Sequence, residues 1–129
     1  MKILSVSTVE AHLMNIGPHL PKLLVVSATG RVPTGGWTAI RLSEYVYVRE
    51  PDDGILGFDM IGDPPFGPAL EVVLPAAASS VILAPPWVRG VKVEAVENEV
   101  TALLQEGVPV LPDISAYRAR AEQQPLAGR

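Results

Sequence analysis

Aromatic and arginine side chains recur along one extended run, and these residue types suit binding better than catalysis. They are Trp37, Arg41, Tyr45 and Tyr47, which share the same parity in the sequence. Alternate residues of a β-strand lie on one face of the sheet, so an unbroken strand would present all four as one ribbon. Tryptophan, tyrosine and arginine dominate the energetics of protein interfaces. The pattern predicts a contact surface for a protein, a sugar or a small polar ligand.

A second interpretation of these residues is structural. Trp37 follows the glycine pair Gly35-Gly36, which favours a sharp turn or bulge, and its ring would then fill the core. The two tyrosines would lie on a half-covered face. The parity argument also assumes a regular strand, and a bulge at Ser43-Glu44 would reverse it. Both interpretations remain open at the level of the sequence.

Acid–base chemistry has His12 as its alternative candidate, paired with Glu10 or with Asp59, and the sequence marks no catalytic residue beyond these. The serine-nucleophile motif Gly-x-Ser-x-Gly is absent. The glycine motifs that bind dinucleotides and nucleotide phosphates are absent as well. We therefore predict no cofactor and favour a protein that is not an enzyme. A ligand pocket near Trp37, Arg41 and His12 is the alternative.

Metal binding is not predicted. The two histidines, His12 and His19, lie on either side of a turn region, and no further ligand accompanies them at a favourable spacing. Asp52 and Asp63 flank one extended segment and would be roughly 30 Å apart. Aspartates beside glycine or proline are typical of turns, in which they bond their own backbone.

Composition limits the function classes. The chain has 129 residues, 48% hydrophobic residues, a net charge of −4 and no cysteine. Its negative charge argues against nucleic acid or an anionic membrane as the main partner. The first residues lack the unbroken apolar segment of a signal peptide, and no apolar run is long enough to cross a bilayer. The predicted compartment is the cytoplasm.

Short extended segments separated by glycine and proline predict an all-β domain. The expected segments are 2–13, 22–32, 37–49, 55–61, 69–74, 77–83 and 88–96. Glu97-Asn98 would turn a final hairpin returning through 100–104, or Asn98 would cap a short helix ending at Glu106. This pattern predicts an antiparallel β-sandwich, immunoglobulin-like, or a small barrel of seven to eight strands. The domain would span residues 1–112, followed by a helical or disordered tail over 113–129 with a helix from Asp113 to about Gln124.

One segment points to a partner. Residues 76–83 carry no charge and are bounded by prolines. An apolar strand of this kind promotes association when it lies at a sheet edge, unless a neighbouring strand or subunit covers it. The sequence therefore favours a protein-interaction module that binds another protein, including a second copy of itself.

The pattern Gly-x-Val-Pro-Thr-Gly-Gly-Trp-Thr over residues 30–38 is followed by the turn Pro51-Asp52-Asp53-Gly54 and by Phe58-Asp59. In these features, residues 25–96 resemble small bacterial β-rich proteins of unknown function that carry Gly-x-Val-x-x-Gly-Gly-Trp-Thr. The resemblance implies a β-rich fold and brings no activity, ligand or catalytic residue.

Overall fold

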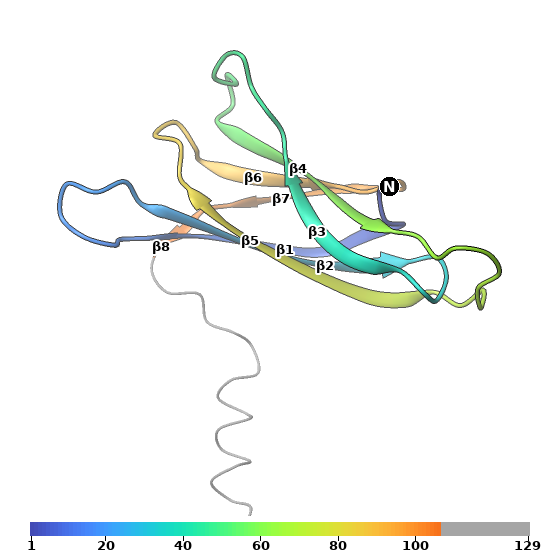
Figure 1. Cartoon of the computed structure of the whole chain (residues 1–129). Coiled ribbons are helices and arrows are strands. Elements are labelled where there is room, and N and C mark those ends of the chain that lie inside the picture. The colour runs from blue at the N-terminus through green and yellow to red at the C-terminus, as the bar shows by residue number, and fades with distance from the viewer. Residues whose placement is uncertain (107–129) are drawn as a thin grey trace, which may run out of the picture.

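Eight strands form two four-stranded sheets in the computed structural model, which describes residues 1–106 (Figure 1). The strands are β1 (Ser5–Met14), β2 (Leu23–Val32), β3 (Thr38–Glu44), β4 (Ile55–Asp63), β5 (Leu74–Leu83), β6 (Gly90–Glu94), β7 (Glu99–Leu103) and β8 (Gln105–Glu106). The strand orders are β5-β2-β1-β8 and β3-β4-β6-β7. The described residues contain no helix, and the all-β sandwich predicted from the sequence is confirmed. The two sheets do not close into the alternative barrel.

The pairing is mostly antiparallel, with two exceptions. β4 pairs with β6 in parallel, and β1 pairs in parallel with the two residues of β8. A parallel pair requires a crossover connection. Between β4 and β6 the chain passes through β5, which belongs to the other sheet, so β5 serves as the crossover. The alternation of apolar and polar residues within one segment does not indicate which strands pair or in which direction.

The predicted segments differ from the strands mainly at their ends. The run expected over 37–49 ends at Glu44, and residues 69–73 form part of a loop in which the Gly35 N–H donates to the Leu70 carbonyl. The final hairpin is confirmed, since the Ala95 N–H donates to the Asn98 carbonyl before β7 begins. The predicted tail over 113–129, with its helix from Asp113, lies outside the described residues.

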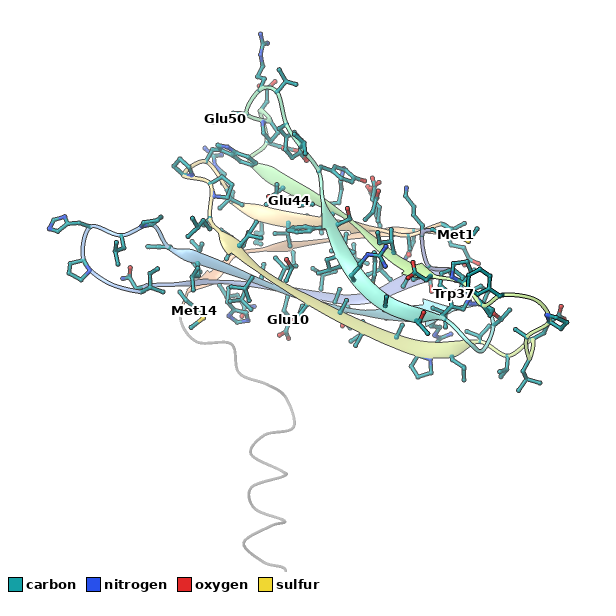
Figure 2. All side chains as sticks on the ribbon, viewed as in Figure 1. Met1, Glu10, Met14, Trp37, Glu44 and Glu50 are labelled. Atoms are coloured by element: carbon teal, nitrogen blue, oxygen red, sulfur yellow. The ribbon has the colours of Figure 1, made fainter. Side chains whose placement is uncertain are left out.

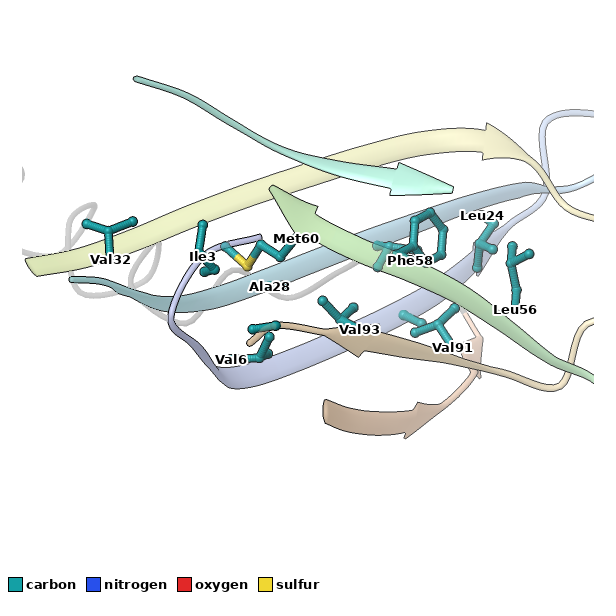
Figure 3. Close-up of a cluster of buried hydrophobic side chains, with 13 residues drawn as sticks. Ile3, Val6, Leu24, Ala28, Val32, Leu56, Phe58, Met60, Val91 and Val93 are labelled. Atoms are coloured by element: carbon teal, nitrogen blue, oxygen red, sulfur yellow. The ribbon is translucent and has the colours of Figure 1, made fainter. Parts of the chain in front are cut away.

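The core lies between the two sheets and is built from alternating residues of their inner faces (Figure 3). Leu56, Phe58 and Met60 of β4 are almost completely buried, as their alternation predicts. Side chains from β1, β2 and β6 pack against them. The buried members of this group are Val6, Ala11, Leu24, Val26, Ala28, Val32, Val91 and Val93.

The first four residues connect the sheets. Lys2 forms an isolated bridge with Ile61 of β4, and the Ile3 N–H donates to the Met60 carbonyl. The next residue changes sheets, because the Leu4 N–H donates to the Arg31 carbonyl on β2. The Ile3 side chain is fully buried where the chain crosses. This crossing brings Lys2 to the outer face of the sheet that contains β4.

A side chain takes the place of a strand neighbour at a bulge in β1. The pairing of β1 with β2 shifts register between Val6 and Thr8. At this irregularity the Asn98 amide accepts from the Val6 N–H and donates to the Val6 carbonyl, both at 2.8 Å. An amide side chain has the donor and acceptor needed to mimic a backbone partner. Asn98 thus fixes the β6–β7 turn against β1 rather than capping a helix.

Removing the largest buried side chain tests the location of the core. Phe58 is 0% exposed, whereas Phe66 in the loop before β5 is 104% exposed. We expect Phe58→Ala to lower the free energy of unfolding by about 3–5 kcal/mol, because it leaves a cavity in the core. Phe66→Ala, a chemically identical change, should stay within about 0.5 kcal/mol of the unsubstituted protein. Urea denaturation followed by fluorescence measures both, and equal losses would contradict this core.

Candidate functional site

The predicted ribbon of aromatic and arginine residues is interrupted by a bulge. The register between β3 and β4 shifts between Thr38 and Arg41, and Ala39 has a positive φ of 53°. The Arg41 guanidinium donates to the Ala39 carbonyl at 2.8 Å and lies 3.4 Å from an Asp63 carboxylate oxygen. Arg41 therefore supports the bulge from the outer face. The bulge lies at Ala39 rather than at the Ser43-Glu44 step considered from the sequence.

Trp37 falls on the other side of this bulge and packs against the core. Its ring lies close to Gly62, where an added Cβ would come within 3.2 Å of the indole. The indole N–H donates to the Thr34 hydroxyl at 3.2 Å. The expectation of one face shared by Trp37 and Arg41 does not hold, because the extra residue in the bulge reverses the alternation.

Tyr45 joins two carboxylates on the outer face of the second sheet. Its hydroxyl lies 2.8 Å from Asp59 on β4 and also donates to Glu94 on β6. A phenol has one proton, so the two carboxylates share one donor. The Lys2 ammonium lies 3.6 Å from both carboxylates, and Lys92 lies 3.5 Å from Glu94. We call these five residues the Tyr45 cluster.

The electrostatics of the Tyr45 cluster favour a fixed network. Burial, together with the hydrogen bonds and charges of Glu94 and Asp59, raises the pKa of the Tyr45 hydroxyl above its usual range. The hydrogen bond from Tyr45 lowers the pKa of Glu94, with Lys92 and Lys2 acting in the same direction against the effect of burial. The phenol therefore keeps its proton and the carboxylate stays ionised. Such a pair is a donor and an acceptor held together, and it supplies no free nucleophile.

The absence of a side chain at Gly57 makes room for both tyrosines. A Cβ there would clash with the Tyr45 ring and would lie 3.0 Å from the Tyr47 hydroxyl. The Gly57 N–H donates to that hydroxyl at 3.0 Å, while the Gly57 carbonyl accepts from the Tyr45 N–H. The Tyr47 side chain thus replaces the backbone partner that β3 would supply if it continued. Gly57 on β4 and the two tyrosines that follow β3 therefore depend on one another for their packing and hydrogen bonds.

The orientation of the aromatic rings does not provide a flat platform for stacking. The rings of Tyr45 and Tyr47 are inclined by 54°, and Tyr47 meets Trp87 edge-on at 84°. Trp37 lies at the opposite end of the sandwich from Met14 (Figure 2) and contributes no exposed ring next to the tyrosines. These residues therefore do not form a pair of coplanar exposed rings on which a sugar could stack.

Of the two acid–base pairs considered from the sequence, His12 with Asp59 is separated, because these residues lie on different sheets, whereas Glu10 lies beside His12 on β1. His12 pairs with Val25 near the start of β2, and Asp59 belongs to the Tyr45 cluster on β4. The imidazole is 6% exposed, and its Nε2 lies 3.8 Å from a Glu10 carboxylate oxygen. Neither ring nitrogen has a hydrogen-bond partner among the described residues. His12 is also far along the sheet from Trp37, which follows the opposite end of β2.

The remaining polar residues considered from the sequence serve turns and surface pairs. The Asp53 carboxylate accepts from the Ile55 N–H at 3.0 Å, and Asp63 lies at the far end of β4. Within residues 1–106, no three histidine or acidic side chains gather as metal ligands would. A pocket of about 500 Å³ lies elsewhere, at the end of the sandwich formed by the β1–β2 and β5–β6 loops. Its lining is mainly apolar and includes Leu13, Leu20, Pro85 and Val88.

The outer edge of β5 carries a row of backbone groups without a strand partner. β5 pairs with β2 alone and ends its sheet, and β3 of the other sheet lies close to β5 without pairing with it. The Ala84 N–H donates to the Lys22 carbonyl, and the register continues from there without a shift. Even-numbered residues of β5 therefore direct their N–H groups to β2, and odd-numbered residues direct theirs outward. The outward N–H donors belong to Ala77, Ser79, Val81 and Leu83.

The other sheet edges in the described part of the chain are shorter or carry charge. β3 has seven residues, a bulge and the charged side chains of Arg41 and Glu44. β7 has five residues and begins with Glu99, and β8 has two residues. Bulges, charges and short length are the usual protection of an edge strand against pairing. β5 has ten residues and no charge, and only its proline provides such protection.

Several residues of this architecture were not identified from the sequence. Lys2, Lys92 and Glu94 come together only because β4 pairs in parallel with β6 and the N-terminal residues cross between sheets. Alternation on β6 indicated that Lys92 and Glu94 share a face, but not which strand they meet. The uncharged segment around β5 was visible in the sequence, whereas its place at the edge was not.

No family model matches the chain, and the searches of curated proteins and of solved structures found no match either. The similarity of residues 25–96 to small bacterial β-rich proteins stays a prediction. Residues 1–106 contain no helix with the length and hydrophobicity to span a membrane.

The shared hydrogen bond of Tyr45 should contribute to stability. Tyr45→Phe removes the hydroxyl donor from Asp59 and Glu94, whose side chains remain 29% and 25% exposed. Because water and Lys2 partly compensate, we expect a loss of about 1 kcal/mol in the free energy of unfolding. Equilibrium urea denaturation at neutral pH measures the loss. An unchanged midpoint would show that the Tyr45 cluster does not stabilise the fold.

The lowered pKa of Glu94 should make stability depend on acid pH. A carboxyl group whose pKa is lower in the folded state stabilises the protein above its unfolded pKa, about 4.3 for glutamate, and loses this effect as the pH falls. We expect Glu94→Gln to destabilise the protein at pH 7, with the difference shrinking steadily below about pH 4.3. Glu50→Gln, in the exposed β3–β4 loop, is the control. Thermal unfolding across pH measures both, and a pH-independent difference for Glu94→Gln would contradict this assignment.

Proposed function

We propose that this chain is a non-enzymatic protein-interaction module that associates with a second copy of itself through the outer edge of β5. The observation that carries the proposal is the row of four outward N–H donors on an uncharged strand of ten residues. Strand addition to an open edge gains affinity from main-chain hydrogen bonds and specificity from the flanking side chains. We place this association in the cytoplasm, without nucleic acid or membrane as a partner.

The side chains around the edge support a protein partner. Val81 and Leu83, which lie on the outer face of the sheet, are 59% and 61% exposed. No residue of β5 is charged, so two copies of the strand meet without repulsion between like charges. Large apolar residues in this position are a liability in a monomer, because an open edge recruits other strands. A second copy would cover both the backbone groups and these side chains.

The Tyr45 cluster supports the non-enzymatic part of the proposal. Its tyrosine keeps its proton, and its carboxylates are bonded to it and to lysines. His12 and Asp59 lie on different sheets and do not cooperate. The tyrosine and the carboxylates of the Tyr45 cluster are thus held in structural contacts, and the His12 ring nitrogens have no hydrogen-bond partner among the described residues.

A charge placed on the open edge should disrupt the association. We expect the unsubstituted protein to form dimers in a concentration-dependent manner, and Val81→Lys to stay monomeric because lysine on an edge strand opposes pairing. The matched control is Leu103→Lys, which changes another exposed aliphatic residue, 71% exposed, on edge strand β7. Sedimentation velocity over about two orders of magnitude in concentration measures the change.

A single pair of edge strands forms a small interface, so we expect the association to be weak. Interfaces that bury less than about 1,200 Å² are typically transient, so we expect dissociation constants on the order of micromolar or weaker. Circular dichroism would verify that both lysine variants keep the β-sheet spectrum. A protein that stays at 13.7 kDa at every concentration would refute self-association. Equal dimerisation of Val81→Lys and the unsubstituted chain would exclude β5 as the interface.

A further inference from the structure

Prolines mark both ends of the open edge at equal distances from Ser80. Pro75 lies five residues before Ser80 within β5, and Pro85 lies five residues after it, just beyond the end of the strand. Pro75 is odd-numbered, so its nitrogen lies on the open side of β5. Proline has no N–H to donate, and it is tolerated there because no neighbouring strand needs that hydrogen bond. The stretch that can pair therefore runs from Ala77 to Leu83 and is symmetric about Ser80.

We propose that two copies pair their β5 strands antiparallel, with Ser80 on the two-fold axis of the dimer. This inference rests on the self-association proposed above and specifies its register. Ala77 of one copy then faces Leu83 of the other, and Ser79 faces Val81. These are the positions whose N–H and carbonyl groups point outward, so they form the hydrogen-bonded pairs of the new ladder.

In this register every outward donor meets an outward acceptor. Each copy supplies four N–H groups, and all of them face carbonyl groups of the same stretch in the other copy. Pro75 of one copy faces Pro85 of the other beyond the last hydrogen-bonded pair, where neither ring nitrogen needs to donate a hydrogen bond. The two sheets containing β5 join into one continuous sheet across the axis.

Neighbouring registers leave backbone groups without partners. Centring the pair on Ser79 places Pro75 opposite Leu83, whose carbonyl then faces a ring nitrogen that cannot donate. Centring it on Ala78 places Pro75 opposite Val81 and carries Leu83 past the start of the strand, to residue 73. An unpaired polar group costs free energy when it is buried, so these registers are less favourable than the one on Ser80.

The side chains are compatible with the Ser80 register. Ile82 faces Ala78 on the inner side, Leu83 faces Ala77 on the outer side, and the axis carries two small serines. Each large residue is therefore opposite a small one, which avoids steric conflict across the new strand pair. Side chains directly opposite each other interact across a strand pair and add to its stability.

Single cysteines can read this register directly, because the natural chain has no cysteine. In the Ser80 register the two copies of Ser80→Cys lie opposite each other in a non-hydrogen-bonded pair, with Cα atoms about 4.5 Å apart. This separation lies within the range of disulfides. The two copies of Ser79→Cys would be diagonal neighbours with Cα atoms about 7–8 Å apart, and those of Ala78→Cys would lie farther apart still.

The experiment oxidises each single-cysteine protein at a concentration where the unsubstituted protein is dimeric, and follows covalent dimer by non-reducing electrophoresis. We expect Ser80→Cys to form disulfide-linked dimer at least about tenfold faster than Ala78→Cys or Ser79→Cys. Adding Val81→Lys to the Ser80→Cys protein should abolish the cross-link. Circular dichroism and sedimentation of the reduced variants verify that each retains the fold and the association.

The outcomes separate the register from the association. Faster cross-linking of Ala78→Cys or Ser79→Cys would overturn the Ser80 register while supporting the β5 interface. Dimers by sedimentation with no cross-link at any of the three positions would overturn the Ser80 register, and dimers that persist with Val81→Lys would overturn β5 as the interface. Monomers at every concentration would refute the proposed function itself.

Discussion

Hydrogen bonding of the backbone groups at strand edges and irregularities is the constraint on which this sandwich depends. A buried N–H or carbonyl without a partner costs about as much as a lost hydrogen bond, so each irregularity in a sheet must be compensated. The Asn98 amide bonds Val6 at the bulge of β1, and the Tyr47 hydroxyl bonds the Gly57 N–H beyond the end of β3. Side chains thus supply backbone hydrogen bonds where a neighbouring strand does not. Within residues 1–106, the outer edge of β5 is the longest stretch in which no side chain or strand supplies them.

The Tyr45 cluster holds β3, β4 and β6 together on the outer face of their sheet, outside the core. Inside the sandwich, Phe58 belongs to the buried cluster, and a one-residue slip of β6 would turn Val91 and Val93 out of that cluster. Outside, Tyr45 reaches from the end of β3 across Asp59 on β4 to Glu94 on β6, with Lys2 beside both carboxylates. A one-residue slip of β6 along β4 would separate these groups. The polar network therefore reinforces a register that the buried face already specifies, and the core supplies most of the stability.

The sequence predicted the elements of the fold better than their connections. Alternation over Leu56, Phe58 and Met60 identified both the strand and its buried face, because this periodicity is local. The parallel pairing of β4 with β6 depends on contacts between distant segments, which no local pattern encodes. The loop before β5 was misassigned as a strand since its apolar residues resemble one, although its neighbouring prolines disfavour regular pairing.

In the candidate site, too, the sequence identified individual residues better than it identified their arrangement. Trp37 and Arg41 share parity in the sequence, and a single extra residue at Ala39 places them on opposite sides of the sheet. A bulge is a property of two strands together, so parity in one strand does not reveal it. The uncharged character of β5 was readable from composition alone. Its exposure was not, because an uncharged apolar strand is also typical of the buried centre of a sheet.

Closure distinguishes a dimer through β5 from open-ended aggregation. A two-fold pairing of identical edges uses the same surface on both copies, so it leaves no second β5 edge for a third copy. The edges that remain in the described part of the chain are the bulged β3, the five residues of β7 and the two residues of β8. None of them offers a long uncharged row of donors. Self-association through this single long uncharged edge would therefore stop at a closed pair, whereas two such edges on each copy would allow a fibre to grow.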